Sequence, residues 1–514
     1  MQELKEYTLL NGEIILYTGS PDLKMIEQLS RGYGDIWHSS LDQGFRNAFS
    51  DVVYQTAVFF WYINDFEGLD ECVSWRINPH QFAIRKTAWD LLGGFDKDYK
   101  NIFLAAFQLG FNALRYQGVV PLYIKGLFND VKVENVHIST EDRYIFFRKN
   151  FKKDHSIYML FRKGFWKWSE WAAFKYAKKN FRFSSAAKPL YPPRPLKEIE
   201  GNPTASYIIP TMFRQDYTVQ LLNDLALQVY KPKEVIVVDA TPADQRDESL
   251  YDPSKYPFEL KVIWQQTKGS CRARNEAIAL CTGDYIVFGD DDIRVVPDYI
   301  EKHIRMLQTY NAGGCNGLDI KADHPQQDLS DLEAKLKARE ATRWMAGAAQ
   351  IFNNANSCVK REYVEILKGN DINYDGGYGE DGDFGLSLVE LGVPVMQNPF
   401  ATSLHLKPPA GGYRVWGAQA KVMGKTRKKQ PWELDTPVKI IRPVPSPTVM
   451  YLFYKHYNSR QITEYKYKYF FLFLARGSKS QLIKRLLRVP YKLLQFNKSV
   501  FYAKKLLALG VRTK

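Results

Sequence analysis

The sequence predicts an α/β protein in which a main domain with a largely parallel sheet follows a smaller α/β region and precedes a basic helical tail. The main domain is predicted because short β-branched runs alternate with helical spacing between about residues 204 and 408, and two of these runs end in aspartate. The tail is predicted from charge, since residues 451–514 contain 15 Lys and Arg but a single acid, Glu464, in a chain of net charge +15. The remaining residues are therefore nearly neutral.

The expected strands and helices of the main domain follow one another in regular order. They are a strand over 205–211 ending at Pro210-Thr211, helical spacing over 219–228, a strand over 234–239 ending at Asp239, a strand over 262–264, a helix over 272–280, and a strand over 285–288. Strands that alternate with helices favour a parallel sheet covered on both faces.

Three consecutive carboxylates, Asp290, Asp291 and Asp292, directly follow the last of these strands. Open α/β sheets bind ligands at the carboxyl ends of their strands. Because like charges repel, such a cluster is costly unless a cation neutralises it. The pattern favours a divalent metal site, and a solvated acidic turn is the alternative.

Five sequence strings place these aspartates in a wider pattern: SYIIPTMFR, KEVIVVDAT, GSCRARNEAI, GDYIVFGDDDI and GGYGEDGDFG. In their order and spacing the chain resembles family 2 glycosyltransferases of the GT-A fold, of the bacterial surface-polysaccharide type. The resemblance implies an inverting, metal-dependent hexosyltransferase that moves a sugar from a nucleotide-sugar donor to a glycan or lipid-linked acceptor.

The resemblance also implies donor-binding residues. Asp239 would bind the nucleobase of the donor, and a uridine nucleotide is the default expectation. The wider donor set comprises Pro210, Thr211, Arg214, Asp239, Arg274, Asn275, Asp290 and Asp291. Trp344, next to Arg343, offers a flat ring to a sugar face, and packing in the core is the equal alternative.

The implied metal ligands are Asp292, Asp290 and His405. Asp290 would also lie towards the ribose of the donor. Oxygen ligands suit Mg²⁺ or Mn²⁺, and an imidazole shifts the preference towards Mn²⁺. A structural role is the alternative for His405.

Glu380 and Asp381 follow a glycine-rich stretch and open a predicted helix. The resemblance implies that Asp381 is the general base, with Glu380 as the second choice. A base must lie within hydrogen-bond distance of the hydroxyl that it deprotonates. The alternative is helix capping by Glu380 and Asp383.

Residues 1–135 are interpreted as a degenerate copy of the transferase fold, with an unrelated α/β cap as the alternative. In a by-eye alignment Gly19-Ser20-Pro21 replaces the aspartate triplet and Ala105-Ala106 replaces Glu380-Asp381. The further predicted segments are an aromatic and basic helical segment over 136–186, a Pro-rich linker over 187–203, a catalytic domain over 204–430 and a helical tail over 431–514.

The tail has Leu and Phe at helical spacing between Lys and Arg, and Pro490 is expected to divide it into two helices. Basic amphipathic helices bind anionic membrane surfaces. Packing against the enzyme or a partner, and nucleic-acid binding, are the alternatives. The basic segment around Lys425 to Lys429 is interpreted either as a lid over the site or as a solvated loop.

No apolar run approaches the roughly 20 residues that span a bilayer, and the five cysteines show no metal-type pairing. The sequence shows no signal peptide. We therefore expect a bacterial enzyme in the cytoplasm, peripheral on the inner face of the membrane and without nucleic acid, with homo-oligomerisation left open. The competing hypothesis is a non-catalytic scaffold that binds nucleotide or glycan in a polysaccharide synthesis complex.

Overall fold

The computed structural model describes residues 4–52, 60–129, 137–183, 188–267, 269–413, 433 and 438–514. The predicted lid residues Lys425 to Lys429 lie outside this part of the chain. The chain divides into two compact units. Unit 1 comprises Met1–Pro193, Met345–Gln350 and Tyr457–Leu487, and unit 2 comprises Arg194–Trp344, Ile351–His456 and Arg488–Lys514.

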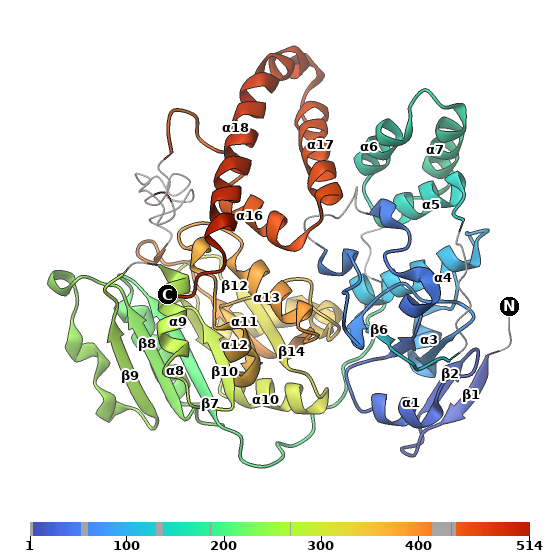
Figure 1. The fold of residues 1–514 in the computed structure, drawn as a ribbon. Coiled ribbons are helices and arrows are strands. Elements are labelled where there is room, and N and C mark those ends of the chain that lie inside the picture. The colour runs from blue at the N-terminus through green and yellow to red at the C-terminus, as the bar shows by residue number, and fades with distance from the viewer. Residues whose placement is uncertain are drawn as a thin grey trace. The chain divides into compact units, whose positions relative to one another are not determined.

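Unit 2 is built on an eight-stranded sheet with the order β11-β14-β12-β13-β10-β7-β8-β9 (Figure 1). Its strands are β7 (Ala205–Thr211), β8 (Glu234–Asp239), β9 (Glu259–Trp264), β10 (Tyr285–Gly289), β11 (Ile293–Val295), β12 (Gly314–Lys321), β13 (Asn356–Lys360) and β14 (Val395–His405). Strands β10, β7, β8 and β9 are parallel, as predicted, whereas β13 is antiparallel to both of its neighbours. The α/β class is confirmed.

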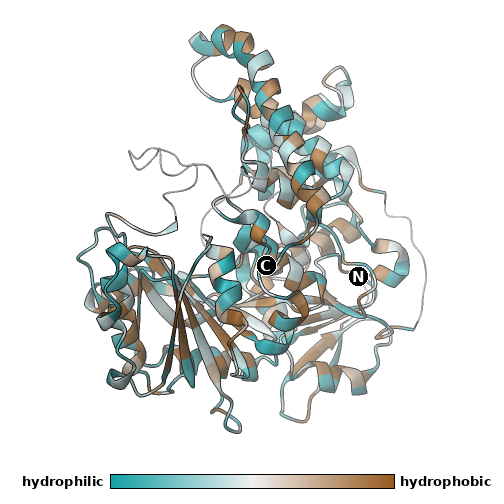
Figure 2. Ribbon diagram, turned by 60° about the vertical axis from the view of Figure 1, so that its left-hand side comes forward, coloured by the Kyte–Doolittle hydropathy of each residue, from teal (hydrophilic) through white to brown (hydrophobic). Residues whose placement is uncertain are grey.

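The central strands of this sheet are buried on both faces, because helices pack on them. Strands β7, β8 and β10 are buried along their whole lengths. This burial explains their near-continuous apolar sequences. The helices of the unit are α8 (Gln215–Ala226), α9 (Ser270–Ile278), α10 (Tyr299–Thr309), α11 (Leu329–Ala338), α12 (Arg361–Leu367), α13 (Glu380–Glu390) and α16 (Pro447–His456). Figure 2 shows hydrophobic residues concentrated in the strands of this sheet.

Unit 1 contains a six-stranded sheet with the order β1-β2-β5-β3-β6-β4. Its strands are β1 (Lys5–Thr8), β2 (Ile14–Tyr17), β3 (Ile36–His38), β4 (Glu71–Val73), β5 (Phe82–Arg85) and β6 (Pro121–Ile124). The helices beside it in the chain are α1 (Leu23–Leu29), α3 (Lys86–Leu92) and α4 (Ile102–Asn112).

Part of the unit 1 sheet has the same topology as part of the unit 2 sheet. Strand β5 is antiparallel to β2 and β3, and β3 is parallel to β6. In unit 2, β13 is antiparallel to β10 and β12, and β12 is parallel to β14. In both units a helix follows the central antiparallel strand directly, α3 after β5 and α12 after β13. This shared topology supports the proposal that residues 1–135 are a degenerate copy.

Three helices follow the unit 1 sheet in the chain and pack together: α5 (Thr140–Asn150), α6 (Lys153–Lys163) and α7 (Trp168–Asn180). Helix α17 (Ser459–Ala475) packs against α6, where Phe471 contacts Tyr158 with ring centroids 5.3 Å apart. The carboxylate of Glu464 accepts hydrogen bonds from Tyr158, at 2.8 Å, and from Arg162. Glu464, the single acid of the tail, is therefore hydrogen-bonded to residues of unit 1.

Helix α18 (Leu482–Leu509) is continuous and contains Pro490 within it. The predicted division into two helices at this proline is wrong. Proline leaves the carbonyl of the residue four positions earlier without its helical donor. That residue is Leu486, which is half exposed, so water can satisfy its carbonyl. In the described part of the chain, none of the helices is both long and apolar enough to cross a bilayer.

Candidate active site

A cavity of about 360 Å³ opens in unit 2 at the carboxyl ends of β7 and β10. The α/β sheet rule predicts a site at this edge. The residues that line it come from strand ends, from helix α9, from the first turn of α13 and from connecting segments. They are Pro210, Arg214, Ser270, Arg274, Asp290, Asp291, Asp292, Lys321, Asn353, Asn354, Tyr374, Gly376, Gly377, Tyr378, Gly379, Glu380, Asp381, His405, Gly412 and Tyr413.

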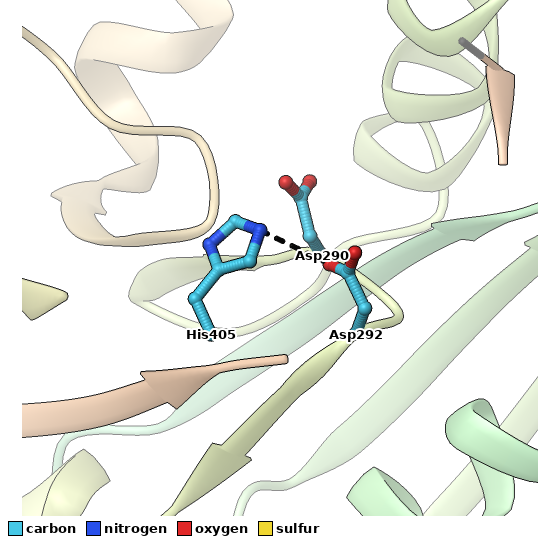
Figure 3. Close-up of side chains that lie close together, drawn as sticks. All are labelled: Asp290, Asp292 and His405. Carbon is cyan, nitrogen blue, oxygen red and sulfur yellow. Dashed lines mark ion pairs between the residues drawn. The ribbon is translucent and has the colours of Figure 1, made fainter. Parts of the chain in front are cut away.

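Asp290, Asp292 and His405 form a group that could hold a metal ion, found among the residues that the structure describes. One ligand atom from each lies within 4.8 Å of the others. Figure 3 shows Asp290 and Asp292, which follow β10, near the imidazole of His405 at the end of β14, with a dashed line for the ion pair between His405 and Asp292. His405 Nε2 lies 3.3 Å from an Asp292 oxygen. Two carboxylates and an imidazole fit Mn²⁺ or Mg²⁺, so these donors agree with the predicted metal ligands.

His405 is held by a second carboxylate that the sequence reading did not identify. Its Nδ1 lies 3.2 Å from Asp319 Oδ2, on the neighbouring parallel strand β12, and 2.6 Å from Lys321 Nζ. Burial alone would lower the pKa of His405, but the hydrogen bond to Asp319 and the nearby carboxylates raise it. The hydrogen bonds and charges of His405 and Lys321 outweigh burial and lower the pKa of Asp319 to about 2.

Arg214 pairs with the second and third aspartates of the triplet. Its Nη1 lies 2.9 Å from an oxygen of Asp291 and 2.9 Å from an oxygen of Asp292. Asp291 also accepts a hydrogen bond from the Thr211 hydroxyl at 2.8 Å. Asp291 therefore connects β7 to Arg214. Asp292 contacts both Arg214 and His405.

Arg274 contacts the candidate metal group, and its charge acts to lower the pKa of Asp381. The guanidinium donates to Asp290 at 2.7 Å, and its side chain is almost fully buried. Its Nε and Nη1 are buried and have no hydrogen-bond partner in the described structure. Because a buried cation needs anionic partners, these two donors point to a negatively charged ligand in the cavity.

Glu380 and Asp381 form the first turn of α13, which Gly379 starts with φ 111°. A side chain would be strained at that backbone angle. Asn354 donates a hydrogen bond to Asp381. Burial and then its charge repulsion with Asp381 raise the pKa of Glu380, and burial, partly opposed by Arg274, raises that of Asp381. A carboxylate with a raised pKa is a stronger base. Glu380 and Asp381, the two candidates for the general base, both line the cavity.

Four residues of the predicted donor set do not line this cavity: Thr211, Asp239, Asn275 and Trp344. Asp239 is fully buried and already accepts hydrogen bonds from the Tyr251 hydroxyl at 3.0 Å and the Thr241 amide at 2.8 Å. Trp344 packs against Phe400, with ring centroids 5.6 Å apart, and under the Arg343 guanidinium. Thr211 does not line the cavity, but its hydroxyl donates a hydrogen bond to Asp291, which does.

Asn275 faces the C-terminus. Its amide donates to the carbonyl oxygens of Asn370, at 2.7 Å, and Thr513, at 2.9 Å. The chain end continues this contact, since Ile372 N donates to Arg512 O at 2.8 Å and Asn373 donates to Gly510 O at 2.7 Å. Residues 510–513 thus hold the loop that leads to Gly379 and the predicted base, an arrangement that no local sequence signal indicated.

Comparisons with known proteins bear on this domain. Residues 206–365 match the family model "Glycosyl transferase family 2". A stretch of 141 residues is 26% identical to the putative teichuronic acid biosynthesis glycosyltransferase TuaG of Bacillus subtilis, covering 27% of this chain and 54% of that protein. A stretch of 116 residues is 29% identical to the putative colanic acid biosynthesis glycosyl transferase WcaA of Escherichia coli, covering 22% of this chain and 42% of that protein. Matches to the curated relatives span from 15% to 54% of the relatives' own lengths.

Solved structures also resemble the chain. The mannosyltransferase PcManGT of Pyrobaculum calidifontis, in complex with GDP-Man and Mn²⁺, has a TM-score of 0.34 and 19% identity, covering 61% of this chain and 90% of that one. S. aureus TarS 1–349 with UDP-GlcNAc has a TM-score of 0.35 and 16% identity, covering 60% and 83%. Residues 206–365 are thus similar to family 2 glycosyltransferases, in agreement with the resemblance that the sequence motifs predict.

Proposed function

We propose that the protein is an inverting, metal-dependent glycosyltransferase that moves a sugar from a nucleotide-sugar donor, a UDP-sugar by default, to a glycan or lipid-linked acceptor in cell-surface polysaccharide synthesis. One observation carries the proposal: the group of Asp290, Asp292 and His405 shares a single cavity with Asp381. The names of relatives in teichuronic acid and colanic acid biosynthesis support the polysaccharide context.

The proposed reaction is a direct displacement. Asp381 takes the proton of the acceptor hydroxyl, the oxygen bonds to the anomeric carbon, and the bond from that carbon to the diphosphate breaks. Asp290, Asp292 and His405 would hold Mn²⁺ or Mg²⁺, which supplies Lewis-acid stabilisation of the leaving diphosphate. Arg274 and Lys321 line the same cavity, and their positive charges favour the same anion.

Recognition of the nucleobase by Asp239 requires a rearrangement of the hydrogen bonds that this carboxylate already accepts. Because both the Tyr251 hydroxyl and the Thr241 amide already donate to this carboxylate, a uracil edge would have to displace or share these partners. The identity of the nucleotide is therefore the first quantity to measure.

Calorimetric titration with UDP, GDP and CDP in the presence of Mn²⁺ tests the proposal. We expect one nucleotide to bind, and binding to be lost in EDTA and in Asp292→Ala. Asp298→Ala, an aspartate outside the cavity that pairs with Lys302, is the matched control. Metal-dependent binding without sugar transfer to any acceptor would favour the scaffold hypothesis, and failure of the folded protein to bind any nucleotide would overturn the assignment.

We also propose that the protein is peripheral on the cytoplasmic face of a membrane and that the first half of α18 lies on the anionic surface. At 100° per residue, its apolar side chains cover one face of about 140°. They are Leu482, Ile483, Leu486, Leu487, Leu493 and Leu494, all of which are exposed. The cations on the other face are Lys484, Arg485, Arg488 and Lys492.

The second half of the same helix packs on protein, since Phe496, Tyr502 and Leu506 are buried. Sedimentation with phosphatidylglycerol vesicles tests the difference between the halves. Leu487→Glu, at a side chain that is 78% exposed, should weaken vesicle binding about tenfold without unfolding the protein. Leu506→Glu should instead destabilise the fold, because it buries a charge. Unchanged vesicle binding by Leu487→Glu would contradict the proposal.

A further inference from the structure

The turn between α6 and α7 exposes an aromatic cluster in unit 1. Trp166 and Trp168 are 72% and 78% exposed, and Phe161 and Phe165 are about half exposed. Aromatic side chains bury large apolar areas when they find a partner. Four of them within eight residues at the end of a helical hairpin indicate a surface built to contact something else.

The core of the hairpin does not include the two exposed tryptophans. That core is formed by other residues, which are buried: Tyr158, Met159 and Leu160 on α6, and Ala173, Phe174 and Ala177 on α7. Phe174 contacts Tyr144 of α5, with ring centroids 6.1 Å apart. Phe161 joins the cluster to the packed face, since its ring lies 5.6 Å from that of Phe471 on α17, whereas Trp166 and Trp168 are exposed.

The turn is held in a defined conformation. Helix α6 ends at Gly164, whose φ is 122° and whose amide donates to Leu160 O at 3.0 Å. Lys167 N donates to Gly164 O at 3.0 Å, and the Trp171 indole donates to Phe165 O. The Phe165 ring lies 5.4 Å from Phe161 and 5.3 Å from Trp166. The aromatic side chains are thus pre-organised, which lowers the entropy lost on binding.

The surroundings of the cluster are strongly basic. Residues 151–183 contain nine Lys and Arg against two acids, a net charge of +7. Lys167 lies between the two exposed tryptophans, and Lys175 lies 5.7 Å from the Trp168 ring centroid. Both acids are paired: Glu170 accepts a hydrogen bond from Tyr144, and Asp154 lies 3.9 Å from Arg476.

We infer that this turn is a membrane-docking element that places Trp166 and Trp168 in the interface of an anionic bilayer. Tryptophan prefers the headgroup level, where its ring is in apolar surroundings and its N–H is hydrated. Lysines beside it are attracted to anionic lipid by about 1 kcal/mol each. This chemistry does not depend on the transferase activity, and it adds a second contact to that proposed for α18.

Two other occupants fit the same turn less well. A second copy of the chain would bring together two surfaces of like charge, which is unfavourable. A glycan would need carboxylates or amides beside the rings to bind its hydroxyl groups, but the polar neighbours of these rings are chiefly lysines.

A single probe position distinguishes this turn from α18. Ser169→Cys, exposed and next to Trp168, is labelled with an environment-sensitive fluorophore in the full chain; the five native cysteines are all buried. Ser254→Cys, exposed in unit 2, is the matched control. With vesicles of phosphatidylcholine and phosphatidylglycerol we expect a blue shift, and quenching by doxyl lipids, for the probe at 169 and not at 254.

Variants then test the side chains themselves. The double variant Trp166→Ser, Trp168→Ser should weaken vesicle binding about tenfold, whereas Trp344→Ser in unit 2 should not change it. Thermal unfolding of each variant checks that it folds. The absence of a probe shift on vesicles would overturn the proposal. A shift that follows protein concentration without lipid would overturn it in favour of a second copy, and a shift caused by oligosaccharide would overturn it in favour of a glycan.

Discussion

At the scale of single residues, the least expected feature of the site is the support of His405. Asp319 holds one ring nitrogen of this histidine while the other faces Asp292. A carboxylate behind a metal-binding histidine fixes the orientation of the ring and raises its basicity. Asp319 is therefore a positioning residue for the metal group.

Asp319→Asn should weaken Mn²⁺ binding about 10- to 100-fold. The measurement is direct titration of Mn²⁺ by electron paramagnetic resonance, which needs no substrate. Asp323→Asn, on the exposed carboxylate that pairs with Lys335, serves as the control. Equal Mn²⁺ affinity of Asp319→Asn and the unaltered protein would show that Asp319 does not support the ligand.

Asp381→Asn should reduce kcat about 10²- to 10⁴-fold, because the amide cannot accept the hydroxyl proton. Nucleotide affinity should change much less than kcat, since Asp381 is not one of the three predicted metal ligands. If Glu380→Gln alone abolished transfer while Asp381→Asn kept full activity, the roles of the two carboxylates would be reversed.

The rate should also depend on pH in a defined direction. The base must be ionised, and burial raises the pKa of Asp381. Activity should therefore be complete above this raised pKa and be lost as the pH falls through it, at a higher pH than for an exposed aspartate. A pH–rate profile measured under single-turnover conditions checks this, and a profile that is flat across this range would contradict the assignment.

At the scale of elements, the C-terminal segment after α18 organises the loop before α13. Gly510 and Arg512 accept hydrogen bonds from Asn373 and Ile372, and Arg512 also donates to the Asn373 side chain at 2.8 Å. The loop lies in unit 2 and leads to the glycine that starts α13. These contacts thus stabilise the backbone that precedes the predicted base.

Removal of residues 511–514 should increase hydrogen exchange in the loop over 370–379 about tenfold, because each lost hydrogen bond contributes about 1 kcal/mol. Hydrogen exchange followed by mass spectrometry locates the effect. Lys514→Ala, at an exposed side chain, is the control. Protection of this loop that is unchanged after truncation would show that the terminus only rests on it.

At the scale of the whole molecule, two units with related sheets differ in their chemistry. Where the unit 2 strand β10 leads into three aspartates, the unit 1 strand β2 leads into Gly19, Ser20 and Pro21. The helix α4 carries Ala105 and Ala106, both buried, at the positions aligned with Glu380 and Asp381. At these aligned positions, all of which the structure describes, unit 1 has neither the metal carboxylates nor a base.

Because unit 1 lacks these groups, Asp292→Ala should leave no measurable transfer from the rest of the chain. A radiolabelled donor assay with long incubation measures any residual activity. Ser20→Asp in unit 1 should not restore transfer to this variant, because one carboxylate does not supply the remaining ligands or the base. Residual transfer that survives Asp292→Ala but not Ser20→Ala would place a second active site in unit 1.

The sequence by itself determined the α/β class and the main residues of the cavity. Strand periodicity and the motif strings identified Asp290, Asp292 and Asp381, because these residues lie in continuous strings at the ends of predicted elements. His405 was placed beside them from its position in the resemblance, although it is more than a hundred residues further along the chain.

Only the tertiary structure decided which side chains meet across elements. Asp319, Asn354 and the C-terminal carbonyl groups have no local pattern, since their partners lie far away in the sequence. The continuous helix at Pro490 likewise depends on the exposure of its backbone. Periodicity reports the environment of one segment, whereas a site is formed by contacts between segments, and those contacts exist only once the chain is folded.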